Sequence, residues 1–251
     1  MTRHALITGA GSGIGEVISR QLHAEGYRVS LVGRRIEPLQ TLSTSLGSGS
    51  QALAGDVTDR AGMVECFATA REHLGDIDIL VNCAGVAPTA PFHRLDFTEW
   101  QRTMDVNVNG VFHCTQIALE NMLNAGWGRV ISIASVASLR GFPYVSGYCA
   151  SKHAVLGMTR ALALEVATRG ITVNAICPGY VDTDIVRSAI AEIVSKTGRT
   201  AEDALQHFTE SNPQGRLIKA SEVASAVRWL CSDGAASVTG QAVSIDGGGT
   251  A

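Results

Sequence analysis

Short runs rich in valine and isoleucine alternate along this chain with longer amphipathic stretches, and this alternation limits the possible folds more than any other feature. The runs are too short for helices and almost wholly apolar, as expected of strands buried on both faces of a parallel sheet. They cover residues 5–8, 29–32, 79–81, 130–133, 171–176 and 242–245, with a weaker candidate at 51–55. Helical patterns lie between them at about 13–25, 36–46, 60–74, 98–124, 148–169 and 220–231. The alternation predicts one α/β domain over residues 1–251, a Rossmann-like doubly wound parallel sheet of about seven strands.

Composition excludes several other classes of protein. Apolar residues make up 45% of the chain, which is enough to bury a core, and the formal net charge is −3, so we expect no nucleic-acid partner. The six cysteines form no CxxC pair and the seven histidines no i,i+4 pair, so we expect neither a disulfide framework nor a metal site. No export signal or membrane-spanning stretch is visible, which predicts a cytoplasmic protein without a membrane partner.

The segment over residues 184–217 interrupts the alternation. It contains no strand, and its two short helical patterns are separated by residues 196–199. In a doubly wound sheet, an insertion after the carboxyl end of a strand lies over the ligand crevice. The segment is therefore predicted to be a helical substrate lid, with a surface excursion of no functional consequence as the alternative.

The first predicted strand ends in a glycine-rich turn, Thr8-Gly-Ala-Gly-Ser-Gly-Ile-Gly15, and a helix follows. Glycines allow the backbone to turn sharply and to approach a pyrophosphate, while the start of the helix offers it free N–H groups. The strand–turn–helix context is that of a dinucleotide-binding loop. The Gly-Lys-Ser/Thr ending of a nucleoside-triphosphate loop is absent.

The second predicted strand ends in Gly33-Arg34-Arg35. An acidic residue at this point of a dinucleotide fold accepts a hydrogen bond from the ribose 2′-OH and repels a 2′-phosphate. A guanidinium instead suits a 2′-phosphate, both by charge and by bidentate geometry. We therefore expect NADP(H) to be the preferred cofactor and NAD(H) to be the alternative; a solvated arginine at a strand end would carry no such preference.

Tyr148 and Lys152 are four residues apart in a predicted helix and so share one of its faces. A nearby ammonium favours the phenolate and lowers the pKa of a tyrosine. Such a tyrosine gives a proton to a carbonyl oxygen or takes one from an alcohol. Ser135 follows the strand predicted over 130–133, where its hydroxyl can stabilise a developing oxyanion.

Together these motifs resemble those of the short-chain dehydrogenase/reductase family over essentially the whole chain. The matching stretches, in order, are Thr8–Gly15, Asn82–Gly85, Asn107–Gly110, Ser135, Tyr148–Lys152, Pro178–Gly179 and Thr183. The resemblance implies that Tyr148 is the general acid/base and that Lys152 lowers its pKa and holds the nicotinamide ribose. It further implies that Ser135 orients the carbonyl and that Asn107 anchors a water in a proton relay.

The resemblance also implies a set of cofactor-binding positions, spread over the loops that follow the strands. Cys83 departs from the asparagine that is commoner in the family. The implied set is Gly9, Ser12, Gly13, Ile14, Gly15, Arg34, Arg35, Asp56, Val57, Asn82, Ala84, Gly85, Tyr148, Lys152, Pro178, Gly179, Val181 and Thr183.

The residues expected to contact the substrate are mostly apolar or aromatic, and no concentrated set of cations awaits a small carboxylate. This favours a neutral ketone or the 3-oxo group of a thioester. Cations of the predicted lid could meet the phosphates of a pantetheine carrier or CoA, and a solvated helix face is the alternative. The substrate residues are Ser138, Phe142, Tyr144, Tyr180 and Val186, and the lid cations are Arg187, Lys196, Arg199 and Arg216.

Two functions remain open at this point. The chain is similar to 3-oxoacyl-(ACP/CoA) reductases and to polyketide ketoreductases, which implies an NADPH-dependent reductase acting on a 3-oxoacyl thioester or a related polyketide. The alternative is an NAD(P)-dependent dehydrogenase that oxidises a secondary or cyclic alcohol, such as a hydroxyacyl-CoA, a sterol or a sugar. A redox-sensing binding protein would lack part of the catalytic tetrad, which is complete here. The family resemblance further suggests a homotetramer.

Overall fold

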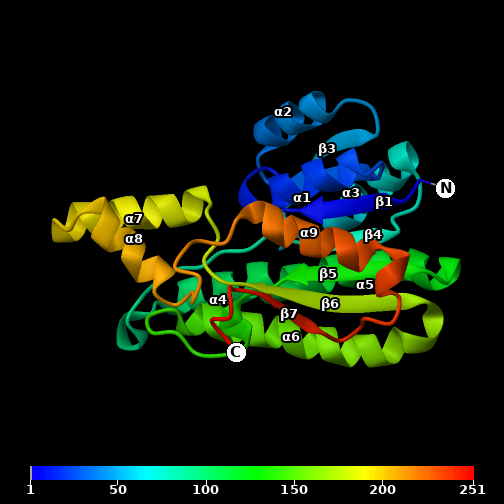
Figure 1. The fold of residues 1–251 in the computed structure, drawn as a ribbon. Helices are drawn as coiled ribbons and strands as arrows, with labels where there is room; N and C mark the ends of the chain where they lie inside the picture. The colour runs from blue at the N-terminus through cyan, green and yellow to red at the C-terminus, as the bar shows by residue number, and fades with distance from the viewer. Residues whose placement is uncertain (1) are drawn as a thin grey trace.

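The computed structural model describes residues 2–251 and places seven parallel strands in one sheet (Figure 1). The spatial order is β3-β2-β1-β4-β5-β6-β7. The strands are β1 (His4–Thr8), β2 (Arg28–Gly33), β3 (Ser50–Ala54), β4 (Ile79–Asn82), β5 (Gly128–Ile133), β6 (Ile171–Pro178) and β7 (Ala242–Ile245). This confirms the predicted sheet, including the weaker candidate at 51–55. The strand order reverses between β1 and β4, so the carboxyl ends of these strands form the switch point at which doubly wound sheets bind ligands.

Helices cover both faces of the sheet (Figure 1). The stretch predicted as a single helix over 98–124 is instead divided, because a π-helical turn over Asp105–Asn109 joins two α-helices. Such turns often occur at functional sites, and Asn107 lies within this one. The helices are α1 (Gly13–Ala24), α2 (Ile36–Leu46), α3 (Arg60–Leu74), α4 (Phe97–Met104), α5 (Gly110–Ala125), α6 (Ser146–Val166), α7 (Asp184–Thr197), α8 (Ala201–Thr209) and α9 (Ala220–Cys231).

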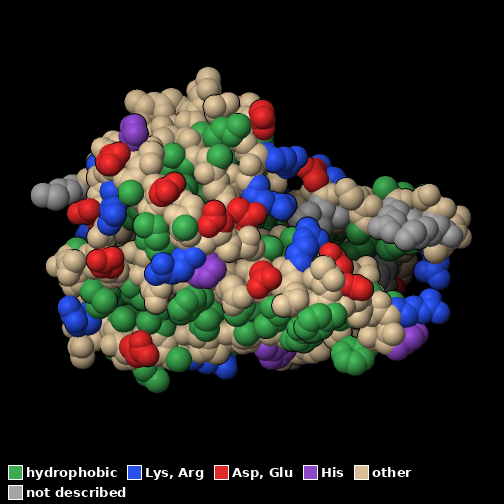
Figure 2. Space-filling view, turned by 180° about the vertical axis from the view of Figure 1, so that it is seen from behind, with side chains coloured by type: hydrophobic (Ala, Val, Ile, Leu, Met, Phe, Trp, Pro, Cys, Tyr) green, Lys and Arg blue, Asp and Glu red, His purple; other side chains and the backbone are tan. Residues whose placement is uncertain are grey.

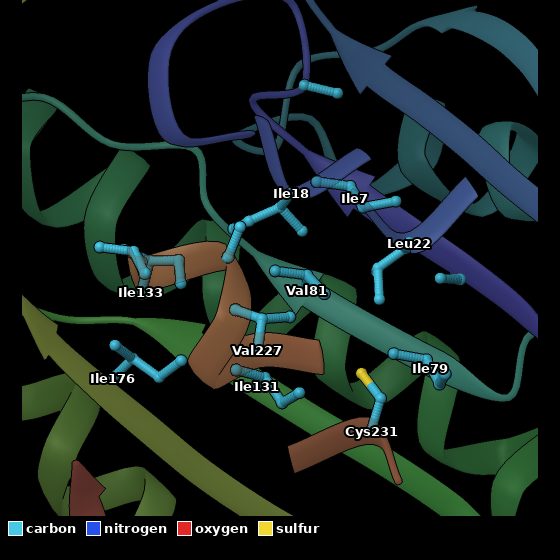
Figure 3. Packing of buried hydrophobic residues seen from close by; sticks show 14 of the residues in the cluster. Ile7, Ile18, Leu22, Ile79, Val81, Ile131, Ile133, Ile176, Val227 and Cys231 are labelled. Atoms are coloured by element: carbon cyan, nitrogen blue, oxygen red, sulfur yellow. The ribbon is translucent and has the colours of Figure 1, made fainter. Parts of the chain in front are cut away.

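The core is divided into two main layers because successive side chains of a strand point to opposite faces of the sheet. Ile7 of β1 packs in the layer under α1, α2 and α9, whereas its neighbour Leu6 packs in the layer under α3, α5 and α6. In the first layer, Ile18 of α1 and Val227 of α9 converge on Val81 of β4 (Figure 3). Each such fully buried aliphatic side chain contributes about 1.5–3 kcal/mol to folding. This packing holds the strand ends, and therefore the loops that follow them, in fixed positions.

The segment over residues 184–217 forms α7 and α8, which project from the body of the molecule (Figure 1). The two short helices agree with the pattern in the sequence. The buried side chains of Val186 and Phe208, one from each helix, anchor the segment at its base.

Charges of both signs are interspersed over the face shown in Figure 2, in keeping with the small net charge. Hydrophobic side chains gather in a band along the lower half of this face (Figure 2). Among residues 2–251, no helix is both long enough and apolar enough to span a bilayer.

A buried polar network lies between the amino-terminal half of the sheet and the loop that follows α3. The ring of His4 is fully buried, and its Nδ1 lies 2.7 Å from the carbonyl oxygen of Gly75. Because a carbonyl only accepts, Nδ1 carries the proton, and the hydroxyl of Ser30 donates to Nε2 over 2.7 Å. Gln51 in turn donates to Ser30. The network is therefore satisfied only while His4 is neutral.

Folding is expected to become less favourable as the pH falls below the ordinary histidine pKa of 6.5. Burial lowers the pKa of His4, so in this range the unfolded chain binds a proton that the folded chain does not. The free energy of unfolding should therefore decrease with falling pH, by at most about 1.4 kcal/mol per pH unit. The free energy of unfolding, measured with urea at several pH values above and below 6.5, should change less with pH in His4→Gln than in the wild type. The exposed His153 provides the control, since His153→Gln should keep the wild-type slope; equal slopes in all three proteins would contradict the assignment.

Candidate active site

The loops that carry the sequence motifs meet at the carboxyl edge of the sheet, beyond β1, β4, β5 and β6. Thr8, the last residue of β1, joins the first two of these loops. Its hydroxyl oxygen accepts hydrogen bonds from the backbone N–H groups of Cys83 (3.1 Å) and Ala84 (3.2 Å), which follow β4. The glycine-rich turn and the Asn82–Gly85 stretch therefore form one unit at the switch point.

The glycine-rich turn is packed so closely that side chains are excluded from it. Gly9 has a φ of +67°, and a Cβ on it would lie 2.8 Å from the nitrogen of Ala84. A Cβ on Gly15 would collide with the carbonyl oxygen of Gly9. Ser12 is the N-cap residue of α1 and is exposed, and its side chain makes no capping hydrogen bond. This bare backbone at the start of α1 fits a pyrophosphate.

The loops beyond β2 and β3 carry four more of the predicted cofactor residues. The end of β2 is joined to the glycine-rich turn by a hydrogen bond from the N–H of Ala10 to the carbonyl of Val32 (3.2 Å). Arg34 and Arg35 are exposed and, among the residues that the structure describes, have no hydrogen-bond or ion-pair partner. Asp56 uses one carboxylate oxygen to accept hydrogen bonds from the N–H and the hydroxyl of Thr58. Val57 is buried against Gly110 at the start of α5. Two exposed guanidinium groups thus follow β2, at the position where the sequence led us to expect recognition of the ribose.

Tyr148 and Lys152 lie on the first turns of α6, and Ser135 lies two residues beyond the end of β5. The Ser135 hydroxyl accepts a hydrogen bond from the N–H of Ala137 (3.1 Å) and lies close enough to the Tyr148 phenol to lower its pKa. The Nζ of Lys152 donates to the carbonyl oxygen of Ile133 (2.8 Å) and lies 5.6 Å from the centroid of the Tyr148 ring. The three side chains predicted to carry chemistry are therefore close together.

Asn107 is linked to this group through Ser151. Its Nδ2 donates to the Ser151 hydroxyl (3.0 Å), which donates to the carbonyl oxygen of Tyr148 (2.7 Å). Asn107 also forms two hydrogen bonds with the backbone of Val86, one as donor (2.9 Å) and one as acceptor (2.8 Å). Sequence reasoning missed the role of Ser151. The available signal was its position, three residues after Tyr148, where a helical side chain reaches back to the preceding turn.

Burial determines the ionisation of the two central groups. It raises the pKa of Tyr148 to about 12, although the hydrogen bond with Ser135 opposes the rise. It lowers the pKa of Lys152 to about 8. The sequence led us to expect a lowered pKa for Tyr148, and that expectation is wrong for this structure. The largest cause is the desolvation of the phenolate by burial, and the ammonium of Lys152 donates its hydrogen bond to the carbonyl of Ile133.

The loop after β6 lies on the other side of the glycine-rich turn. Pro178 is the last residue of β6, and Val181 is buried in an isolated bridge with Ile218. Thr183 donates to the carbonyl of Val181 (3.3 Å), and its methyl group lies 3.5 Å from where a Cβ of Gly13 would be. The structure thus brings together the predicted cofactor residues of the first and last loops.

The predicted substrate residues are less closely grouped. The rings of Tyr180 and Phe208 meet edge to face, with centroids 5.0 Å apart. Ser138 and Val186 are buried, Phe142 is half-buried, and Tyr144 is 65% exposed, with a backbone φ of +66°. Tyr180 alone of the five lines a cavity of ≈ 10 Å³, which is enclosed by Val136, Arg140, Gly179, Tyr180, Phe208, Ser211, Asn212, Asp246 and Gly249.

Two of the four predicted lid cations, Arg187 and Arg216, pair with carboxylates. Arg216 forms two 2.7 Å contacts with the carboxylate of Glu222. Arg187 pairs with Asp182 (3.0 Å) and lies 3.7 Å from Asp184. Arg199 is exposed in a hollow shared with Asp203, Gln206 and Glu210, and the side chain of Lys196 lies outside the described residues. Arg187 and Arg216 are therefore surface cations with acidic partners, which agrees better with the solvated helix face than with the predicted phosphate-binding role.

The cysteines and the possible metal ligands suggest no further chemistry. All six cysteines are free. In residues 2–251, apart from side chains that the structure does not describe, no three His, Cys, Asp or Glu side chains are grouped as metal ligands would be.

Comparison with known proteins gives concordant matches. A family model described as short chain dehydrogenase matches residues 3–193. A D-beta-hydroxybutyrate dehydrogenase from Rhizobium meliloti (strain 1021) is 37% identical and covers 100% of both chains. A 3-oxoacyl-(acyl-carrier-protein) reductase from Escherichia coli is 34% identical over 97% of this chain and 96% of its own. The crystal structure of an actinorhodin polyketide ketoreductase with NADPH superimposes with a TM-score of 0.95, at 38% identity, over 100% of this chain and 98% of that one.

Proposed function

This chain belongs to the short-chain dehydrogenase family of NAD(P)-dependent oxidoreductases acting on CH–OH groups, and we propose that it is an NADPH-dependent ketone reductase. The substrate that we propose is a 3-oxoacyl thioester, carried on ACP or CoA, or a related polyketide. The observation that carries the proposal is the connected group of Tyr148, Ser135, Lys152 and Asn107 beside a glycine-only turn.

The residues fit a dinucleotide. The side-chain-free turn around Gly9 and Gly15 leaves backbone N–H groups at the start of α1 for a pyrophosphate. Thr183, beside Gly13 of the glycine-rich turn, and Lys152, beside Gly85 of the loop beyond β4, would hold the nicotinamide end. When bound, the nicotinamide supplies the hydride that a carbonyl carbon needs.

Tyr148 supplies the proton in this proposal. Because its pKa is raised to about 12, the phenol is protonated at neutral pH and is ready to act as an acid towards a carbonyl oxygen. The Ser135 hydroxyl, which lies beside the Tyr148 phenol, would donate a hydrogen bond to the same carbonyl oxygen and hold it in place. Ser151 and Asn107 fix the backbone of Tyr148 from the far side. Oxidation of an alcohol would first require Tyr148 to lose its proton, so higher pH should favour that direction.

Cofactor preference is expected to depend on Arg34 and Arg35. Their free guanidinium groups would pair with a 2′-phosphate, so the wild type should use NADPH better than NADH. The double substitution Arg34→Gln and Arg35→Gln should lower kcat/KM for NADPH about 10- to 100-fold and leave that for NADH almost unchanged. Arg169→Gln, which removes an exposed cation before the amino end of β6, is the control. A wild-type preference for NADH would contradict this part of the proposal.

The proposed substrate class is tested by turnover. NADPH consumption should be measured with acetoacetyl-CoA, a cyclic diketone and simple ketones, and the reverse reaction with the corresponding alcohols. We expect the highest kcat/KM for the 3-oxoacyl thioester. If no ketone is reduced while a secondary alcohol is oxidised with NAD, the proposed direction and cofactor are both wrong.

That result would favour a second candidate function, the oxidation of a secondary alcohol. Support for it comes from the full-length match to the D-beta-hydroxybutyrate dehydrogenase. Arg34 and Arg35 argue against its use of NAD.

We further propose that the 184–217 segment covers the substrate and that the chain assembles as a cytoplasmic homotetramer. Phe97 on α4 and Phe112 on α5 expose 71% and 47% of their surfaces, which supports contact with a second copy of the chain. Analytical ultracentrifugation should then give four times the mass of one chain.

A further inference from the structure

Arg140 lies five residues after Ser135, at the end of a short stretch of backbone that Ser135 begins. Residues Val136–Ser138 form a 3₁₀ turn capped by Ser135, and the N–H of Arg140 closes the following turn on the carbonyl of Val136 (3.2 Å). The position of Arg140 is therefore fixed relative to Ser135 by a short, hydrogen-bonded stretch of backbone.

The guanidinium of Arg140 stacks over one aromatic ring, that of Phe142. It lies 4.8 Å from the centroid of the Phe142 ring, a distance at which a cation is attracted to the ring face. Arg140 also borders the small cavity lined by Val136 and Tyr180. A stacked guanidinium is pre-organised, so binding through it costs less side-chain entropy than binding through a free one.

Arg140 is electrostatically linked to the reacting residues through Tyr180. Burial raises the pKa of Tyr180, and the positive charge of Arg140 opposes that rise. Tyr180 is in turn one of the groups that influence the pKa of Tyr148. Arg140 and Tyr180 line the same small cavity, and a short hydrogen-bonded turn joins Arg140 to Ser135, so a ligand anion held by Arg140 would lie on the Tyr180 side of the Ser135 segment.

No acidic side chain among the described residues pairs with Arg140, in contrast to Arg187 and Arg216. Asp246 lines the same cavity, but its oxygens accept hydrogen bonds from the N–H of Gly248 (3.0 Å) and the hydroxyl of Thr250 (2.6 Å). The exposed guanidinium thus keeps its hydrogen-bond donors free for a ligand.

We propose that Arg140 is a specificity-determining residue that binds an anionic oxygen group of the carbonyl substrate, on the Tyr180 side of the reaction centre. The inference rests on the proposed ketone reduction, since it gives the substrate of that reaction a negative charge. A carboxylate and a phosphate share the required chemistry, because both present paired oxygens to the guanidinium. It is compatible with our expectation from the sequence that no concentrated set of cations awaits a small carboxylate, because it assigns a single cation to the substrate.

The test compares charged substrates with matched neutral ones. Acetoacetate is paired with its ethyl ester, and acetoacetyl-CoA with acetoacetyl-N-acetylcysteamine. Dissociation constants are measured by calorimetry with the NADP⁺-loaded enzyme, and kcat/KM is measured with NADPH. Arg140→Gln should weaken binding of the charged member of one pair about 10- to 100-fold and leave its neutral partner unchanged. Arg140→Lys should retain part of the preference for the charged ligand, because lysine keeps the positive charge but lacks the paired N–H donors of the guanidinium. An effect on the acetoacetate pair would identify a carboxylate as the bound group, and an effect on the acetoacetyl-CoA pair would identify a phosphate.

The control variant is Arg228→Gln, which removes an exposed arginine from α9 and should not alter either pair. Equal weakening of charged and neutral ligands, no weakening of either, or no measurable binding of the charged ligands to the wild type would overturn the inference. Failure of the proposed function gives a different result. In that case binding would still depend on charge and on Arg140, but no ketone would be reduced.

Discussion

Tyr148→Phe is expected to lower kcat for ketone reduction about 10³-fold. The substitution removes one hydroxyl from a buried ring and leaves the packing of α6 unchanged. It deletes the only group in the Ser135–Tyr148–Lys152 cluster that is both protonated at neutral pH and able to deliver that proton to a carbonyl oxygen: the pKa of Tyr148 is about 12, and Lys152 is bound to Ile133. NADPH absorbance assays give kcat, and fluorescence titration should show that the Kd for NADPH changes far less.

Tyr27→Phe is the matched control for Tyr148→Phe, because Tyr27 is a half-buried tyrosine just before β2, outside the candidate site. We expect its kcat to stay close to that of the wild type. If Tyr148→Phe retained full activity on a ketone that the wild type reduces, the proton donor would have to be another group, and the proposed mechanism would be wrong.

Gly9→Ala is expected to destabilise the protein by on the order of 3 kcal/mol and to abolish dinucleotide binding. The added methyl group would require a positive φ of an L-residue and would lie 2.8 Å from the backbone nitrogen of Ala84. Relief of that contact would separate the glycine-rich turn from the loop after β4, which Thr8 now holds together. For a chain of this size, the midpoint of thermal unfolding should fall by roughly 6–12 °C.

Gly11→Ala serves as the control within the same turn. The atoms nearest to its Cβ would belong to the side chains of Pro38 and Leu39, at 3.4 Å or more, and its φ is not in the left-handed region. It should therefore unfold near the wild-type temperature. If Gly9→Ala unfolded at the same temperature as Gly11→Ala and still bound NADPH, the close packing of Gly9 against Ala84 would not be required for the dinucleotide site.

The fold could be predicted from the sequence because its determinants are local. The valine- and isoleucine-rich runs give six of the seven strands to within two residues at each end, since a strand buried on both faces needs apolar side chains at every position. The half-buried β3, which has neither valine nor isoleucine, was the weaker candidate. The glycine-rich turn and the spacing of Tyr148 and Lys152 are likewise local patterns. The π-helical turn around Asn107 was missed, because it depends on contacts with Val86 and Ser151 from distant elements.

By itself, the sequence determined the order of strands and helices, the turn that fits a pyrophosphate and the side chains available for proton transfer. Only the tertiary structure decided the ionisation of Tyr148, the pairing of Arg216 with Glu222 and the free guanidinium of Arg140. The physical reason is that a segment's conformation depends on neighbours a few residues away. A side chain's charge state and partners depend instead on burial and on groups that the fold brings together from remote parts of the chain.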